Sequence, residues 1–131
     1  MNVLVTGHEG YIGARLVPLL QAAGHRVRGV DTNFYTNGRL YDALEVPEEG
    51  AIQKDIRRMT VDDVAGMDAV VHLAELSNDP LGMHNEANTY AINHEGSVHV
   101  AEVCKAAGIN RFVYTSSCSV YGIPADEPVK T

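Results

Sequence analysis

Three glycines, Gly7, Gly10 and Gly13, stand three residues apart directly after an apolar run rich in β-branched residues. This spacing predicts a turn from a strand into a helix. One glycine allows the turn, another lets the backbone approach a pyrophosphate, and the third lets the helix pack close to the sheet. The helix N-terminus then offers N–H groups and a partial positive charge to phosphates. The pattern indicates a dinucleotide site, with an ordinary strand-to-helix turn as the alternative.

A carboxylate stands at the end of the second expected strand. Asp31 lies 18 residues beyond Gly13, where it can accept hydrogen bonds from the ribose hydroxyls of adenosine and repel a 2′-phosphate. A strand-end aspartate that forms a turn is the alternative. Thr32 and Asn33 carry no charge that compensates Asp31, so we expect NAD to be preferred over NADP.

Two serines, Ser116 and Ser117, follow the last expected strand. Ligands of open α/β sheets bind beyond the carboxyl ends of the strands. From that place Ser117 can donate a hydrogen bond to a hydroxyl or carbonyl oxygen of a substrate, and we take it as the catalytic candidate. Ser116 is interpreted as a capping or backbone-bonded residue.

Alternating strands and helices must position these side chains. Apolar runs predict strands at Asn2–Thr6, Arg26–Asp31, Ala51–Gln53, Ala69–Leu73 and Arg111–Thr115. Apolar spacing predicts helices over Tyr11–Ala23, Val61–Ala65 and Asn85–Ala107. Such alternation implies crossovers, and therefore an α/β fold with a Rossmann-like, doubly wound parallel sheet in three layers. Residues 1–131 are treated as one NAD(P)-binding domain.

The composition excludes several other classes of protein. The chain has 131 residues, a formal net charge of −7 and a pI near 5.2, so nucleic acid and anionic membranes are not expected partners. No apolar run is long enough for a membrane span, and no signal peptide is recognisable. Cys104 and Cys118 make no disulfide framework, and His84, His94 and His99 lack metal-ligand spacing. We expect a cytoplasmic protein without a metal.

Two other histidines and one loop have expected places. His72 lies on a buried strand and is expected to be a hydrogen-bonded core residue. His8, inside the glycine loop, is expected to face either phosphate or solvent. The loop at residues 78–82 follows the fourth strand and is expected to lie on the substrate side.

Further motifs resemble those of the extended short-chain dehydrogenase/reductase family, which modifies nucleotide-linked sugars. Its glycine motif is matched by Gly7-x-x-Gly10-x-x-Gly13, and Asp55-Ile56-Arg57 looks like its Asp-hydrophobic-Arg after the third strand. Val71-His72-Leu73-Ala74 resembles the motif beside the pyrophosphate, with Glu75 replacing a second alanine. Asn93 matches an asparagine of the fourth helix, and residues 115–122 (TSSCSVYG) resemble the active-site strand. The resemblance covers the whole chain in order.

The resemblance implies an NAD-dependent enzyme that acts on a nucleotide sugar, with an epimerase working through a transient keto-sugar favoured over a decarboxylase or dehydratase. It implies cofactor contacts at Gly7, Gly10, Tyr11, Ile12, Gly13, Asp31, Asp55, Ile56, Leu73, Ala74 and Asn93, and catalysis by Ser117. Asp55 would meet the amino group of adenine. The resemblance implies that the family's dehydratases carry Asp-Glu at the positions of Cys118 and Ser119, as an acid and a base for the loss of water. A thiol and a hydroxyl are poor substitutes for that acid and base, which argues against dehydration.

The family's acid/base chemistry depends on a Tyr-x-x-x-Lys motif, in which the lysine lowers the tyrosine pKa. None of the 6 tyrosines here has a lysine four residues later. We therefore expect the chain to be the N-terminal part of a longer enzyme, inactive by itself, with the final strands and the substrate lobe absent. The alternative is a non-catalytic NAD-binding module or regulator of the atypical type. The long helix is a candidate homodimer surface.

Overall fold

The computed structural model describes residues 1–34, 50–77 and 83–122. Its strands are β1 (Asn2–Thr6), β2 (Arg26–Asp31), β3 (Ala51–Gln53), β4 (Ala69–His72) and β5 (Phe112–Tyr114). They form one parallel sheet in the order β3-β2-β1-β4-β5. The chain winds outward from β1 in both directions, so the order reverses between β1 and β4. The predicted doubly wound sheet is confirmed, and this reversal is where such sheets bind ligands.

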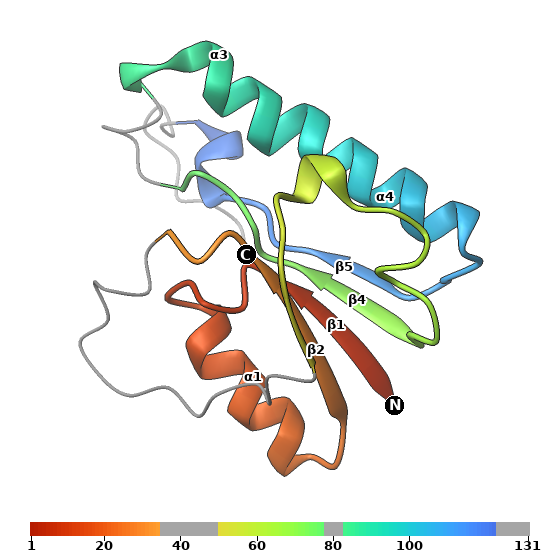
Figure 1. Cartoon of the computed structure of the whole chain (residues 1–131). Coiled ribbons are helices and arrows are strands. Elements are labelled where there is room, and N and C mark those ends of the chain that lie inside the picture. The colour runs from red at the N-terminus through yellow and green to blue at the C-terminus, as the bar shows by residue number, and fades with distance from the viewer. Residues whose placement is uncertain (35–49, 78–82, 123–131) are drawn as a thin grey trace.

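Helices cover both faces of the sheet, which gives the predicted three layers (Figure 1). Helix α1 (Gly13–Ala22) lies on one face and continues past Pro18, as its apolar spacing predicts. The opposite face carries α3 (Glu86–Thr89), a π-helical segment η4 (Tyr90–Gly96) and α4 (Ser97–Ala106) in continuous succession. This run matches the long helix predicted from Asn85, whose side chain caps it by accepting from Asn88 N at 3.0 Å. The π turn inside it is not predicted by the sequence pattern.

The strands alternate their buried side chains between two cores. Toward α4, one cluster contains Leu4, Val30, Ile56, Met59, Val64, Val70, Val100, Val103 and Cys104. Toward α1, the second cluster contains Val3, Val5, Val17, Val27 and Ala69. Because successive residues of a strand point to opposite faces, a continuous apolar run such as β1 fills both cores at once. These two cores fix the carboxyl ends of the strands relative to one another.

One sequence prediction fails in local detail. The predicted helix at Val61–Ala65 is a series of turns instead. In this region the helical structure is a 3₁₀ turn, η3 (Ile56–Arg58), which Asp55 caps. The backbone bonds of residues 60–65 join residues three apart, from Asp63 N to Thr60 O at 3.1 Å and from Ala65 N to Asp62 O at 3.3 Å. Gly66, with a φ of +75°, then ends the segment before an α-helix can form.

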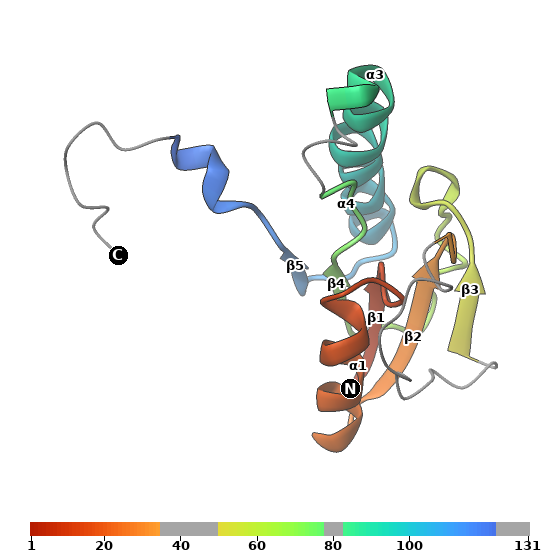
Figure 2. The ribbon, with the colours of Figure 1, turned by 90° about the vertical axis from the view of Figure 1, so that its left-hand side faces the viewer.

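Strand β5 forms one edge of the described sheet. Val113 and Tyr114 on it are 54% and 47% exposed. Beyond β5 the chain leaves the sheet, and the short 3₁₀ helix η5 (Cys118–Tyr121) lies away from the other elements (Figure 2). The loop at residues 78–82, expected on the substrate side, lies outside the described residues. Within the described ranges, no helix has the length and apolar character that crossing a bilayer requires.

Candidate dinucleotide site

The loop between β1 and α1 has the close packing that the glycine spacing predicts. Gly7 has a φ of +71°, and a Cβ there would lie 2.9 Å from the backbone N and Cα of Ala74. A Cβ on Gly13 would lie 2.4 Å from the Gly7 carbonyl oxygen. Both positions therefore require glycine, one for the turn and one for close packing. No side chain of the described residues caps the N-terminus of α1, so this helix end is suited to a pyrophosphate.

Asp31 lies beside this loop. Its carboxylate accepts hydrogen bonds from Glu9 N at 3.1 Å and from Asn33 N at 2.9 Å. An ionised carboxylate has about four acceptor positions, so two remain for a pair of ribose hydroxyls. The structure thus joins the glycine loop and the expected ribose acceptor through Glu9, a link that the sequence pattern does not reveal.

His8 takes neither of its expected positions. It is 5% exposed, and its ring packs so closely on β2 that a Cβ on Gly29 would lie 2.5 Å from it. His8 Nε2 lies 3.1 Å from Glu9 Oε1. The ring therefore anchors the glycine loop to β2. The signal in the sequence is Gly29, a glycine within a strand, which often marks the close approach of another group.

Asp55 lies just beyond the carboxyl end of β3. It accepts from Arg57 N at 2.9 Å and pairs with the Arg57 side chain, with Nη2 and Oδ2 2.6 Å apart. The hydrogen bond from Arg57 holds the Asp55 pKa below its ordinary value, although burial acts the other way. Three Arg57 donors use most of the roughly four acceptor positions of the carboxylate and leave one for an adenine amino group. The Ile56 side chain is buried in the core, so a cofactor contact there falls to its backbone.

A series of buried and partly buried hydrogen bonds joins β1, β4 and the π-helical segment. Ser97 Oγ donates to Asn93 O at 2.6 Å and lies 2.9 Å from His72 Nε2. That serine proton is used, so His72 Nε2–H is the donor, and His72 Nδ1 accepts from the Thr6 hydroxyl at 2.6 Å. Burial lowers the pKa of His72 to about 4, so the ring is neutral at pH 7. His72 is the hydrogen-bonded core residue that the sequence predicts.

This series of hydrogen bonds ends at the backbone of Leu73 and Ala74, which is expected to border the pyrophosphate. The Thr6 hydroxyl accepts from Leu73 N at 3.2 Å and from Ala74 N at 3.3 Å. Asn93 holds the next residues, because its Oδ1 accepts from Leu76 N at 2.8 Å and its Nδ2 donates to Leu76 O at 3.1 Å. Both polar atoms of Asn93 therefore bind backbone. Asn93 therefore positions the segment after β4, whereas the resemblance implies that it contacts the cofactor directly.

At the far end of the sheet, Ser117 follows β5 and is exposed, and its carbonyl accepts from Val120 N at 3.3 Å. The side chains of Cys118 and Ser119 lie outside the described part. Nearby, Tyr114 Oη donates to Glu75 Oε1 at 2.6 Å. This hydrogen bond, together with burial, raises the Tyr114 pKa. The Glu75–Tyr114 pair joins the ends of β4 and β5, and the sequence hint was Glu75 in place of the family's alanine.

The carboxyl ends of the parallel strands lie along one side of the molecule (Figure 1). The predicted residues follow these ends, except Asn93, which lies in the π-helical segment. The uncapped N-terminus of α1, the acceptor positions on Asp31 and the order reversal beside β1 all fit a dinucleotide. In the described ranges, no three histidine, cysteine or acidic side chains form a group that could hold a metal ion. The arrangement can bind two phosphates and two ribose hydroxyls and can present a serine to a substrate.

Comparisons with known proteins identify similar chains. A family model described as "NAD dependent epimerase/dehydratase family" matches residues 3–131. A UDP-glucose 4-epimerase of Klebsiella pneumoniae is 30% identical over 135 residues, which cover 98% of this chain and 95% of the relative. The chain spans 39% of the length of the UDP-glucose 4-epimerase of Rhizobium leguminosarum bv. trifolii and 40% of that of Homo sapiens.

Solved structures show the same fold. A UDP-N-acetylglucosamine 4-epimerase of Methanobrevibacter ruminantium M1 superposes with a TM-score of 0.84 at 26% identity, over 98% of this chain and 42% of that one. A UDP-glucose-4-epimerase of Stenotrophomonas maltophila, with bound NAD and formylated UDP-arabinopyranose, gives 0.82 at 30% identity, over 98% and 40%. Both structures are of UDP-sugar 4-epimerases, and this chain shares their fold over nearly its whole length.

Proposed function

We propose, from the premise that the chain belongs to the NAD dependent epimerase/dehydratase family, that it is the NAD-binding part of a nucleotide-sugar epimerase. The observation that carries this proposal is the geometry around β1. A glycine loop opens α1, and Glu9 N ties that loop to the Asp31 carboxylate at 3.1 Å. The 4-epimerases among the similar chains and structures support the reaction type.

In this proposal the cofactor lies across the carboxyl ends of the strands. The loop Gly7–Gly13 with Tyr11 and Ile12 and the α1 N-terminus would hold the pyrophosphate, beside the backbone of Leu73 and Ala74. Asp31 would bind the ribose hydroxyls, and Asp55 the adenine amino group. When bound, NAD supplies reversible hydride transfer. Asn93 contributes by fixing the Leu76 backbone.

Ser117 is proposed as the residue that meets the sugar. Placed after β5, it would donate its hydroxyl proton in a hydrogen bond to the oxygen of the reacting carbinol and so polarise that bond. Tyr114, on β5, is unsuited to remove a proton, because its hydroxyl donates to Glu75 and its pKa is raised. The general base is therefore expected to be a residue other than Tyr114.

The test uses the chain extended to the length of the longer UDP-glucose 4-epimerases. This protein is assayed for the interconversion of UDP-glucose and UDP-galactose and of their N-acetylated analogues. We expect epimerisation, and we expect Ser117→Ala to lower kcat by about 10²–10³ with NAD affinity unchanged. Binding of NAD without epimerisation of any of these sugars contradicts the epimerase proposal and favours a non-catalytic NAD-binding module. A kcat of the Ser117→Ala variant within a few-fold of the parent would mean that Ser117 has a structural role only.

A further inference from the structure

Lys54 lies between the two residues proposed to bind adenosine. Its backbone N donates to the Asp31 carbonyl oxygen at 2.9 Å, which continues the pairing of β3 with β2 by one residue. Asp55 follows it directly. The backbone of Lys54 therefore links Asp55 to the end of β2 at Asp31.

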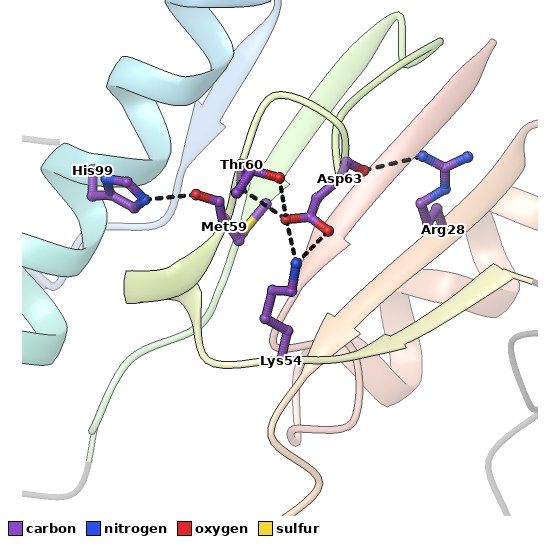
Figure 3. Close-up of polar contacts among 6 residues, drawn as sticks. All are labelled: Arg28, Lys54, Met59, Thr60, Asp63 and His99. Carbon is purple, nitrogen blue, oxygen red and sulfur yellow. Dashed lines mark hydrogen bonds and ion pairs between the residues drawn. The ribbon is translucent and has the colours of Figure 1, made fainter.

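The side chain of Lys54 is held by a buried carboxylate (Figure 3). Lys54 Nζ lies 2.7 Å from Asp63 Oδ1 and 2.8 Å from Asp63 Oδ2. Asp63 is 8% exposed and also accepts from Thr60 N at 2.7 Å. Burial opposes ionisation of Asp63, but the hydrogen bonds from Lys54 and Thr60 outweigh it and keep the Asp63 pKa below its ordinary value. The carboxylate is thus ionised at pH 7, and its bonds to Lys54 are charge-assisted.

The turn that carries Asp63 is itself fixed on two sides. From β2, Arg28 Nη1 donates to the carbonyl oxygens of Asp63 and Ala65, at 3.0 and 3.2 Å. From α4, His99 Nε2 binds Met59 O at 2.8 Å (Figure 3). Asp63 is therefore a rigid anchor, and Lys54 is the residue that it restrains.

We propose that the Lys54–Asp63 ion pair is a positioning device that directs Asp55 toward the adenine amino group, an inference that rests on the proposed NAD-binding function. Lys54 is fixed at its backbone by Asp31 and at its ammonium group by Asp63. This double restraint sets the direction of the chain as it enters Asp55. A hydrogen bond to the adenine amino group requires such restraint, because it weakens steeply when its angle departs from linearity.

The experiment compares two dinucleotides that differ at one group. Nicotinamide hypoxanthine dinucleotide carries a keto oxygen in place of the 6-amino group of NAD, so it offers Asp55 no donor at that position of the ring. Calorimetric titration of the 131-residue chain is expected to show NAD bound about tenfold more tightly, the worth of a hydrogen bond to a charged acceptor. Asp63→Asn is expected to reduce this preference to within about threefold while leaving the affinity for the hypoxanthine analogue unchanged.

Asp62→Asn is the matched control, since Asp62 is the exposed neighbour of Asp63 and the change removes the same charge. It should keep the full preference for NAD. If circular dichroism shows that Asp63→Asn does not fold, the double variant Lys54→Met, Asp63→Leu replaces the pair by apolar side chains, a change that buried ion pairs often tolerate. It should bind both dinucleotides with equal affinity.

The outcomes separate this inference from the proposal on which it rests. A parent chain that binds neither dinucleotide contradicts the proposed function itself. A parent chain that binds both equally removes the Asp55–adenine contact and the inference with it. A clear preference for NAD that survives both Asp63→Asn and the double variant overturns the positioning role alone and leaves NAD binding in place.

Discussion

Asp31 is the side chain on which cofactor choice is expected to depend. Two backbone N–H groups fix its carboxylate, so it is preorganised for a ribose diol and opposed to a 2′-phosphate. Asp31→Ala is expected to weaken NAD binding by about 1.5–3 kcal/mol and to weaken NADP binding much less. Calorimetric titrations of both dinucleotides measure the ratio, with exposed Asp62→Ala as the charge control. An unchanged ratio contradicts this role.

His72 makes stability depend on pH. Burial lowers its pKa to about 4 in the folded state, against about 6.5 in an unfolded chain. The unfolded state then binds more protons between these values, so the free energy of unfolding falls as pH falls from 6.5 toward 4. The loss amounts to roughly 3 kcal/mol at most. Urea unfolding at several pH values measures it, and His72→Gln should show a clearly shallower slope. An equal slope in both proteins rules out His72 as the source.

At the scale of elements, the β1–α1 loop depends on two separate constraints at Gly7. Its φ of +71° favours glycine, and its Cβ position lies 2.9 Å from the Ala74 backbone. Gly24, just beyond α1, has a φ of +81° with no atom within 4 Å of its Cβ position. Gly7→Ala is therefore expected to destabilise the chain more than Gly24→Ala, by about 1–3 kcal/mol, and to abolish NAD binding.

Gly24→Ala carries the backbone cost without the collision, so it is expected to keep its NAD affinity. Urea unfolding and NAD titration of the two variants make the comparison. Equal losses of stability would show that only the backbone conformation matters and that the close approach of β1 to the segment after β4 is unimportant.

Some elements follow from local sequence and others do not. The bounds of β1, β2 and β3 match the strands that the sequence predicts. For β1 the reason is that a buried parallel strand reads as a continuous hydrophobic stretch. The sequence predicts a helix at Val61–Ala65, but residues 61–66 form turns, in which Asp63 is held by Lys54, a partner nine residues away. A period of 3.6 residues does not reveal the π segment of the long helix either.

The candidate site divides in the same way. The glycine loop and Asp31 are visible in the sequence because their types and spacing are themselves the signal. The burial of His8 was missed because it depends on the glycine at position 29 of the neighbouring strand. The use of the Asn93 amide on Leu76 was missed because it depends on two elements meeting in the fold. Contacts between elements far apart in the sequence, such as these two, can be identified only from the structure.

At the scale of the whole molecule, the 131-residue chain is expected to bind NAD without catalysing epimerisation. None of its 6 tyrosines has a lysine four residues later, so the acid/base of the family is missing from the sequence. Incubation with NAD and UDP-sugars, followed by chromatographic separation of epimers, should show no conversion above background. Turnover by this chain alone would show that another group in it acts as the general base, with Tyr121, His94 and Glu75 as the candidates.

The most direct test of the central claim is a calorimetric titration of the 131-residue chain with NAD and, separately, with NADP at the same salt concentration. The account predicts saturable binding of one NAD per chain and clearly weaker binding of NADP, because the glycine loop fits a pyrophosphate and Asp31 repels a 2′-phosphate. The absence of saturable heat with NAD, or tighter binding of NADP, contradicts the assignment of an NAD site to the carboxyl ends of these strands.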